Sequence, residues 1–187
     1  KDIRGMNEFN GVWNIRIEMN GEKEPLDITG YLEKQRPEGL AISLVDIQKR
    51  TVIDNFIIDK SKITKLGDRI YDLKLVAGNQ GYVLEKTQEI INNIPIDYSL
   101  SQNYPNPFNP ITRLDFSLPK RSQVTFVIYN ILGQEVATLI NKELDYGYHK
   151  VRWNGTDFYG KQVSSGVYFA KMITSDFTKS KKMLLLK

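Results

Sequence analysis

The first half of the chain consists of short runs in which apolar and polar residues alternate. This period of two is typical of half-buried β-strands, whose successive side chains point to opposite faces. Over residues 12–19 the apolar side is formed by Trp13, Ile15, Ile17 and Met19. The pair Asn20-Gly21 follows and favours a tight turn. Further strands are predicted at residues 27–32, 40–47, 51–58 and 70–77. Only residues 84–92 have a pattern compatible with a helix, and that pattern is weak.

The second half begins after an extended, proline-rich segment. Pro105, Pro107 and Pro110 cannot donate backbone hydrogen bonds, so they exclude a helix and disfavour a central strand. Strands separated by turns, most of them containing glycine, are predicted at residues 112–118, 123–131, 135–140, 148–153, 166–174 and 181–186. Short strands at this spacing favour an antiparallel β-sandwich. We therefore predict an all-β chain with two β-sandwich modules in tandem, at residues 1–93 and 102–187, joined by a linker at residues 94–101.

The charge distribution agrees with this division. Residues 1–98 carry 14 Lys and Arg against 16 Asp and Glu, a net charge of −2, whereas residues 99–187 carry 12 against 6, a net charge of +6. A change of this kind suggests two modules. The basic half is too weakly charged to indicate a nucleic-acid partner, and we expect none.

Composition excludes several classes of protein. Hydrophobic residues make up 41% and charged residues 26%, which is typical of a globular chain and not of a disordered one. The absence of cysteine excludes disulfides, a thiol nucleophile and thiolate-bound metals, and the single histidine excludes a multi-histidine site. We expect no cofactor. No apolar run is long enough for a transmembrane segment. Because the chain starts at Lys1 without an initiator Met or a signal region, we expect it to be the end piece of a longer precursor.

The second half carries a set of specific motifs. In chain order they are LSQNYPNPFNP at residues 100–110, IYNILGQEV at 128–136, GYH at 147–149, WNGTD at 153–157, SGVYF at 165–169 and KMLLLK at 182–187. By these motifs, their order and their spacing, residues 100–187 resemble the type A C-terminal sorting domain of the type IX secretion system, also called the Por secretion tail. That family is an Ig-like β-sandwich, similar in fold to the Ig-like part of the flagellar hook-capping protein. The first half has no motif specific enough to name a family.

The resemblance implies an address tag and no catalysis in this chain. A tail of this family directs a larger upstream passenger through the outer membrane of a two-membrane bacterium to the cell surface or the medium. The implied partners are the type IX machinery and its surface sortase, which often exchanges the tail for an anionic lipopolysaccharide. The implied sorting residues are Tyr104, Pro105, Asn106, Pro107, Phe108, Gly133, Gly166, Tyr168, Lys182 and Lys187. We also expect Tyr104 and Phe108 to anchor the proline-rich segment to the edge of the core.

Several single residues also allow other interpretations. Asn154 and Asp157 are weak candidate ligands for Ca²⁺, because residues of this type in a turn more often cap their own backbone. The lone histidine, His149, is expected to be a half-buried strand residue rather than a base. The run GTDFYGK at residues 155–161 matches the start of a phosphate-binding loop, but the hydroxyl residue that would follow is missing and no helix is predicted there. An alternative function for the whole chain is an adhesion or carbohydrate-binding module, in which Trp13, Trp153 and the tyrosines would stack on sugars.

Overall fold

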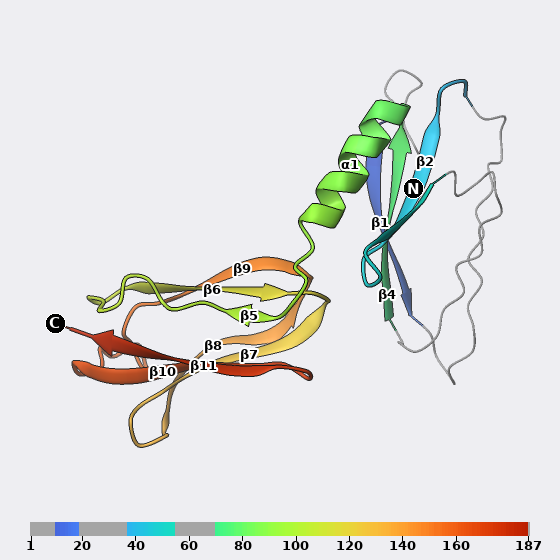
Figure 1. Cartoon of the computed structure of the whole chain (residues 1–187). Helices are drawn as coiled ribbons and strands as arrows, with labels where there is room; N and C mark the ends of the chain where they lie inside the picture. Colours follow the sequence, from blue (N-terminus) through green and yellow to red (C-terminus); the bar gives the residue numbers. More distant parts are fainter. Residues whose placement is uncertain (1–9, 19–36, 55–69, 187) are drawn as a thin grey trace. The chain divides into compact units, whose positions relative to one another are not determined.

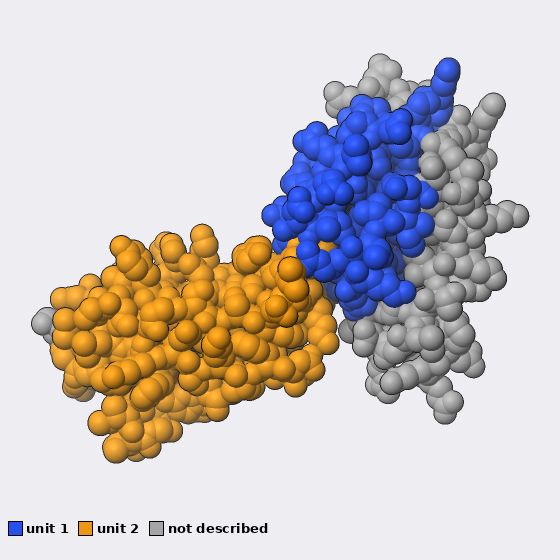
Figure 2. Space-filling view, viewed as in Figure 1, with its two compact units in different colours: residues 1–93 blue, residues 94–187 orange. Residues whose placement is uncertain are grey.

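The computed structural model describes residues 10–18, 37–54 and 70–186, and it divides the chain into two compact units. Unit 1 comprises residues 1–93 and unit 2 residues 94–187 (Figure 2). Each unit is described separately below.

Unit 1 contains an antiparallel sheet and one helix (Figure 1). The strands are β1 (Gly11–Glu18), β2 (Ala41–Asp46), β3 (Thr51–Asp54) and β4 (Ile70–Gly78), in the order β1-β4-β2-β3. On one face the buried Leu44 and Leu73 pack with Ile15, Ile17, Ile53 and Leu75. The helix α1 (Gln80–Asn92) contacts β2 and β4. A depression on the opposite face is lined by Ser43 of β2 and Val83 of the helix, so α1 covers that face.

The helix departs from the sequence-based expectation. It begins four residues before residue 84, where the carboxamide oxygen of Asn79 accepts the backbone N–H of Tyr82 at 2.9 Å. Its buried side chains are Val83 and Thr87, and the Thr87 hydroxyl donates to the Val83 carbonyl at 2.8 Å. The apolar pattern was weak because one of these two buried residues is polar.

Unit 2 is a sandwich of two antiparallel sheets (Figure 1). One sheet has the strand order β11-β10-β7-β8 and the other β5-β6-β9. The strands are β5 (Ser99–Leu100), β6 (Thr112–Leu118), β7 (Ser122–Tyr129), β8 (Glu135–Leu144), β9 (Gly147–Trp153), β10 (Gly166–Ile173) and β11 (Thr178–Leu185). The side chains between the sheets form one continuous core. Its largest fully buried members include Trp153, Phe108, Phe126 and Met172.

The predicted fold class is confirmed: the chain is mostly antiparallel β-structure, and unit 2 is an Ig-like sandwich. In the part of unit 1 that the structure describes, the second layer against the sheet is a helix and not another sheet. The predicted linker at residues 94–101 is wrong at its end, because Ser99 and Leu100 form β5 and Leu100 is buried in the core of unit 2. The strand predicted at residues 27–32 lies outside the described residues, as does Met19.

Candidate functional site

The proline-rich segment is hydrogen-bonded to the last strand of the chain. The Phe108 N–H donates to the Leu184 carbonyl, and the Leu186 N–H donates to the Phe108 carbonyl, both at 2.9 Å. The Asn106 side-chain oxygen accepts the Leu184 N–H at 2.9 Å, and the Gln102 amide donates to a carbonyl of β11 at 2.7 Å. Since β11 is the outermost strand of its sheet, residues 102–108 pair with an edge that would otherwise be open. We call this arrangement the clamp.

A buried carboxamide fixes the shape of the clamp. Asn103 is 2% exposed, and its amide donates to the Pro105 carbonyl and to the Thr112 hydroxyl oxygen, both at 2.9 Å. The Thr112 hydroxyl in turn donates to the same Pro105 carbonyl at 2.9 Å. The peptide bonds preceding Pro105 and Pro107 are both cis. Asn103 did not stand out in the sequence, because a buried structural Asn and a solvated one look alike there.

The two aromatic residues of the clamp have different environments. Phe108 is 2% exposed and belongs to the core, as expected. Tyr104 is 75% exposed, so the expectation that it anchors the segment with its ring is wrong. It contributes instead through its backbone, which exchanges hydrogen bonds of 2.9 and 3.0 Å with the backbone of Arg113.

An aromatic cluster lies beneath the clamp. The ring of Trp153 is 5.6 Å from the ring of Phe108 and 5.0 Å from that of Tyr168. The Tyr168 hydroxyl donates to the Ser164 carbonyl at 2.8 Å, and burial raises the pKa of this tyrosine. Gly155, two residues after Trp153, is buried, and a β-carbon there would lie 3.2 Å from the backbone carbonyl oxygen of Pro110. These aromatic residues therefore support the fold directly.

The remaining residues to which the resemblance assigns a sorting role lie on turns and strands nearby. Gly133, with φ +75°, occupies the turn between β7 and β8. Gly166 begins β10 and is paired with Leu185, next to the clamp. Lys182 is exposed on β11. Lys187 lies outside the described residues.

The candidate Ca²⁺ ligands hold their own turn. The Asp157 carboxylate accepts the backbone N–H groups of Tyr159 and Lys161, both at 2.9 Å. The Asn154 side-chain oxygen accepts the Thr156 hydroxyl at 2.7 Å. In the described part of the chain, no cluster of three or more acidic or histidine residues could hold a metal ion. Residues 155–161 form a turn between strands rather than the start of a helix, which does not fit a phosphate-binding loop.

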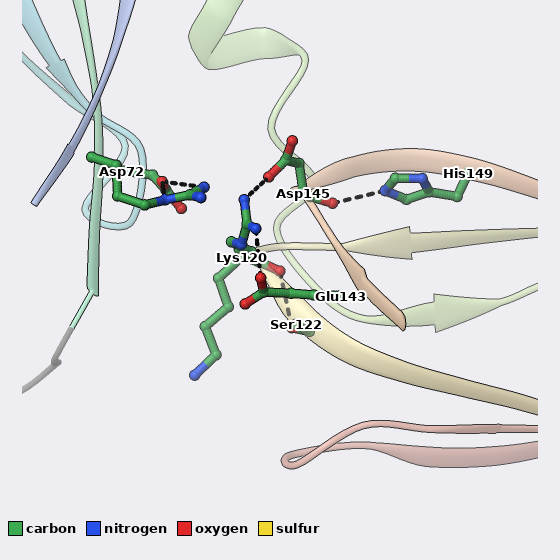
Figure 3. A network of polar contacts seen from close by, with 8 residues as sticks. Asp72, Lys120, Ser122, Glu143, Asp145 and His149 are labelled. Carbon is green, nitrogen blue, oxygen red and sulfur yellow. Dashed lines mark hydrogen bonds and ion pairs between the residues drawn. The ribbon is translucent and has the colours of Figure 1, made fainter. Parts of the chain in front are cut away.

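His149 has a structural environment, as its place in the strand pattern predicts. Its ring stacks on Phe116 at 5.2 Å, and its Nε2 is 2.8 Å from the Asp145 carbonyl oxygen (Figure 3). At the same end of unit 2, Arg121 forms ion pairs with Glu143 and Asp145. No candidate nucleophile is hydrogen-bonded to His149 among the contacts described.

Most of the motif residues gather at one end of unit 2, whereas GYH at residues 147–149 begins β9 at the other end. The clamp, the turns at residues 130–134 and 157–161 and the end of β11 lie at the end that carries the C-terminus, while residues 94–98 enter at the other end (Figure 1). Motifs that are up to 80 residues apart in the sequence thus form one surface region. Among the described residues, no helix has both the length and the apolar character needed to cross a bilayer.

Comparison with known families supports the Ig-like assignment. Residues 110–176 match the FlgD Ig-like domain family, which accounts for the central part of unit 2. No curated protein sequence matches the chain significantly.

Solved structures give weak similarities only. PorZ, a surface component of the type IX secretion system of Porphyromonas gingivalis, has 17% identity and a TM-score of 0.33, covering 60% of this chain and 14% of that one. Latent dimeric PorU from the same organism has 11% identity and a TM-score of 0.39, covering 96% and 20%. The DNA glycosylase AlkC of Pseudomonas fluorescens, bound to abasic-site DNA, has 13% identity and a TM-score of 0.32, covering 57% and 37%. The chain thus spans between 14% and 37% of the length of these structures, and at these scores none of them bears on function.

Proposed function

We propose that unit 2 is a C-terminal sorting domain of the type IX secretion system, which directs an upstream passenger across the outer membrane to the cell surface or the medium. The proposal has its basis in the motifs of residues 100–187, and the match to the FlgD Ig-like domain is consistent with it. In this role the chain has no catalytic activity of its own. Its partners are the secretion machinery and the surface sortase.

The observation that best supports the proposal is the clamp. The first motif of the resemblance, at residues 100–110, binds the last motif, at residues 182–187, through four hydrogen bonds to β11 and Leu186. The first and the last motif therefore lie together in the folded domain. A sorting signal that is recognised after the passenger has been synthesised would need a stable, folded feature of this kind.

The alternative carbohydrate-binding function receives no support from Trp153. Trp153 is 2% exposed, and its indole N–H donates to the Thr156 carbonyl at 2.9 Å. A ring in this position cannot present its face to a sugar. We therefore retain one proposed function.

The experiment is a secretion assay in a bacterium that has a type IX system. A fluorescent reporter with a Sec signal peptide is fused to the full chain, to residues 1–93 alone, or to nothing, and the cells are fractionated. We expect the full-chain fusion at the surface or in the medium and the other two in the periplasm. Equal delivery of the fusion to residues 1–93 would contradict the proposal, as would periplasmic retention of the folded full-chain fusion.

A further inference from the structure

Two turns at the motif end of unit 2 have the same internal hydrogen bonds. They comprise residues 130–134 and 157–161. In each, the side-chain oxygen of the first residue accepts the N–H groups of the third and fifth residues at 2.9–3.0 Å. The glycine at the fourth position donates to the first carbonyl at 3.0–3.1 Å and has a φ of +75° or +77°. The first N–H also donates to the fifth carbonyl. Two separate segments are thus built to one rigid design.

Both turns present a pair of apolar side chains to solvent. In the first turn Ile131 is 70% and Leu132 77% exposed, and in the second Phe158 is 56% and Tyr159 93% exposed. Singly exposed apolar residues are common on protein surfaces. A pair at the tip of a turn that is already fixed by hydrogen bonds is different, because little conformational entropy is lost when it binds a partner.

The first turn also borders a depression, which the second turn does not line. This depression, of about 360 Å³, lies on the outer face of the larger sheet and is lined by Tyr129, Phe169 and Lys171 together with the turn. Its aromatic floor belongs to a row of cross-strand partners that runs Lys182, Phe169, Tyr129, Glu135. The depression can receive a side chain of a partner, and the protruding apolar tip beside it can insert a side chain into the partner.

Two lysines, Lys171 and Lys182, and one glutamate, Glu135, lie around the aromatic floor of this depression. Neither Lys171 nor Lys182 forms an ion pair with any residue that the structure describes. The carboxylate of Glu135 accepts a hydrogen bond from the Tyr129 hydroxyl at 3.2 Å. Burial is the main cause that raises the pKa of Tyr129, and this hydrogen bond is the second. Two lysines beside an aromatic recess complement a surface that carries carboxylates around an apolar side chain.

We propose that the turn at residues 130–134, the depression and the two lysines Lys171 and Lys182 form the docking surface for an acidic protein partner, which inserts an apolar side chain into the depression. This inference rests on the proposed sorting function and assigns the recognition surface within it. The depression can receive a single side chain of a protein, which a flat lipid surface does not offer. The second turn, at residues 157–161, has the same design but does not line this depression, and it therefore serves as a matched control.

The test uses the full-chain reporter fusion and four double variants. Two alter the proposed surface: Ile131→Ser with Leu132→Ser, and Lys171→Glu with Lys182→Glu. One control, Phe158→Ser with Tyr159→Ser, changes the twin turn. The other, Lys142→Glu with Lys179→Glu, makes the same change of charge elsewhere on the same sheet. Circular dichroism and the thermal midpoint of each purified chain establish that it is folded.

We expect the two surface variants to deliver the reporter at least about tenfold more slowly than the parent. Truncating a central interface residue typically lowers the affinity for the partner by a factor of this size. Both controls should match the parent. A zero-length carbodiimide cross-link, which joins lysine amines to carboxylates, should form between the parent chain and a membrane-fraction protein and be lost in Lys171→Gln with Lys182→Gln.

Three results would overturn the inference. The first is unchanged delivery of folded surface variants while the parent is delivered, a result that leaves the sorting function intact. The second is an equal slowing of reporter delivery in the two control variants. The third is binding of the parent chain to phosphatidylglycerol vesicles that both surface variants lose, because the occupant would then be a membrane. If the parent fusion itself stays in the periplasm, the sorting function fails and the inference falls with it.

Discussion

Replacing Phe108 by alanine should separate the two aromatic residues of the clamp. The Phe108 ring is 2% exposed and packs 5.6 Å from Trp153, whereas Tyr104, four residues earlier, is 75% exposed. The backbone bonds of Phe108 to Leu184 and Leu186 are made by its peptide groups and survive the substitution. The loss therefore arises from the side chain alone.

The expected size follows from that burial. Removing a buried Phe ring typically lowers the free energy of unfolding by about 3–5 kcal/mol, through lost apolar burial and the cavity left behind. Tyr104→Ala removes an exposed ring and should change it by no more than about 0.5 kcal/mol. Phe108→Leu keeps most of the apolar volume, so its loss in the free energy of unfolding should lie between the losses of the two alanine variants.

Urea unfolding provides the measurement. In a Trp13→Phe background the fluorescence reports on Trp153, which contacts the altered ring. With a urea dependence of about 1–3 kcal/mol per molar, Phe108→Ala should lower the midpoint by more than about 1 M. A loss below about 1 kcal/mol for Phe108→Ala, or an equal loss for Tyr104→Ala, would refute the role we assign to the clamp.

Three further predictions follow from single contacts. Gly155→Ala should destabilise unit 2 by more than Gly160→Ala in chemical denaturation, because both need positive φ but only the first places a β-carbon 3.2 Å from a carbonyl oxygen; equal losses would contradict this. Limited proteolysis with an enzyme specific for aspartate should cut first at Asp97, which is exposed between α1 and β5, and a first cut inside residues 112–186, seen by mass spectrometry, would be inconsistent with this. A hydrogen bond from Lys120, followed by its charge, lowers the pKa of Asp176 below its ordinary 3.8. This stabilisation is therefore present above about pH 4 and is lost as the pH falls through the depressed value. Lys120→Gln should lower stability by at most about 1 kcal/mol at pH 7, and a difference from the parent that persists at pH 2 would show that another interaction is responsible.

The regular strands of unit 2 could be predicted from the sequence because their signals are local. The run at residues 112–118 alternates and is flanked by turn residues, and β6 has the same bounds. The turn residues predict a break between β7 and β8, where Gly133 adopts positive φ. In such places each residue's preference agrees with the fold.

The clamp could not be predicted, because its hydrogen bonds join residues far apart in the chain. Gln102 and Asn106 bond to residues 80 and 78 positions away. No period or turn signal reports on such a partner. The different burial of Tyr104 and Phe108 could not be predicted for the same reason, because burial depends on whether residues distant in the sequence, such as those of β11, pack against each ring. The twin turns, in contrast, left a signal that could have been found, namely the repeated pattern of Asn or Asp, two apolar residues and glycine.

Because the clamp includes β11, stability and the proposed address are coupled in unit 2. Removing residues 178–187 would take away β11 with its buried Met183 and Leu185, at about 1.5–3 kcal/mol for each large apolar side chain. It would also leave the Phe108 segment without its hydrogen-bond partners. A truncation that blocks export therefore follows equally from unfolding and from loss of an address. Exposed side chains separate the two causes, because Ile131, Leu132 and Lys182 can be changed while the core and the clamp stay as they are. If export of a folded chain depends on those residues, the surface that they form is the sorting signal, and the role of the fold is to hold that surface in place.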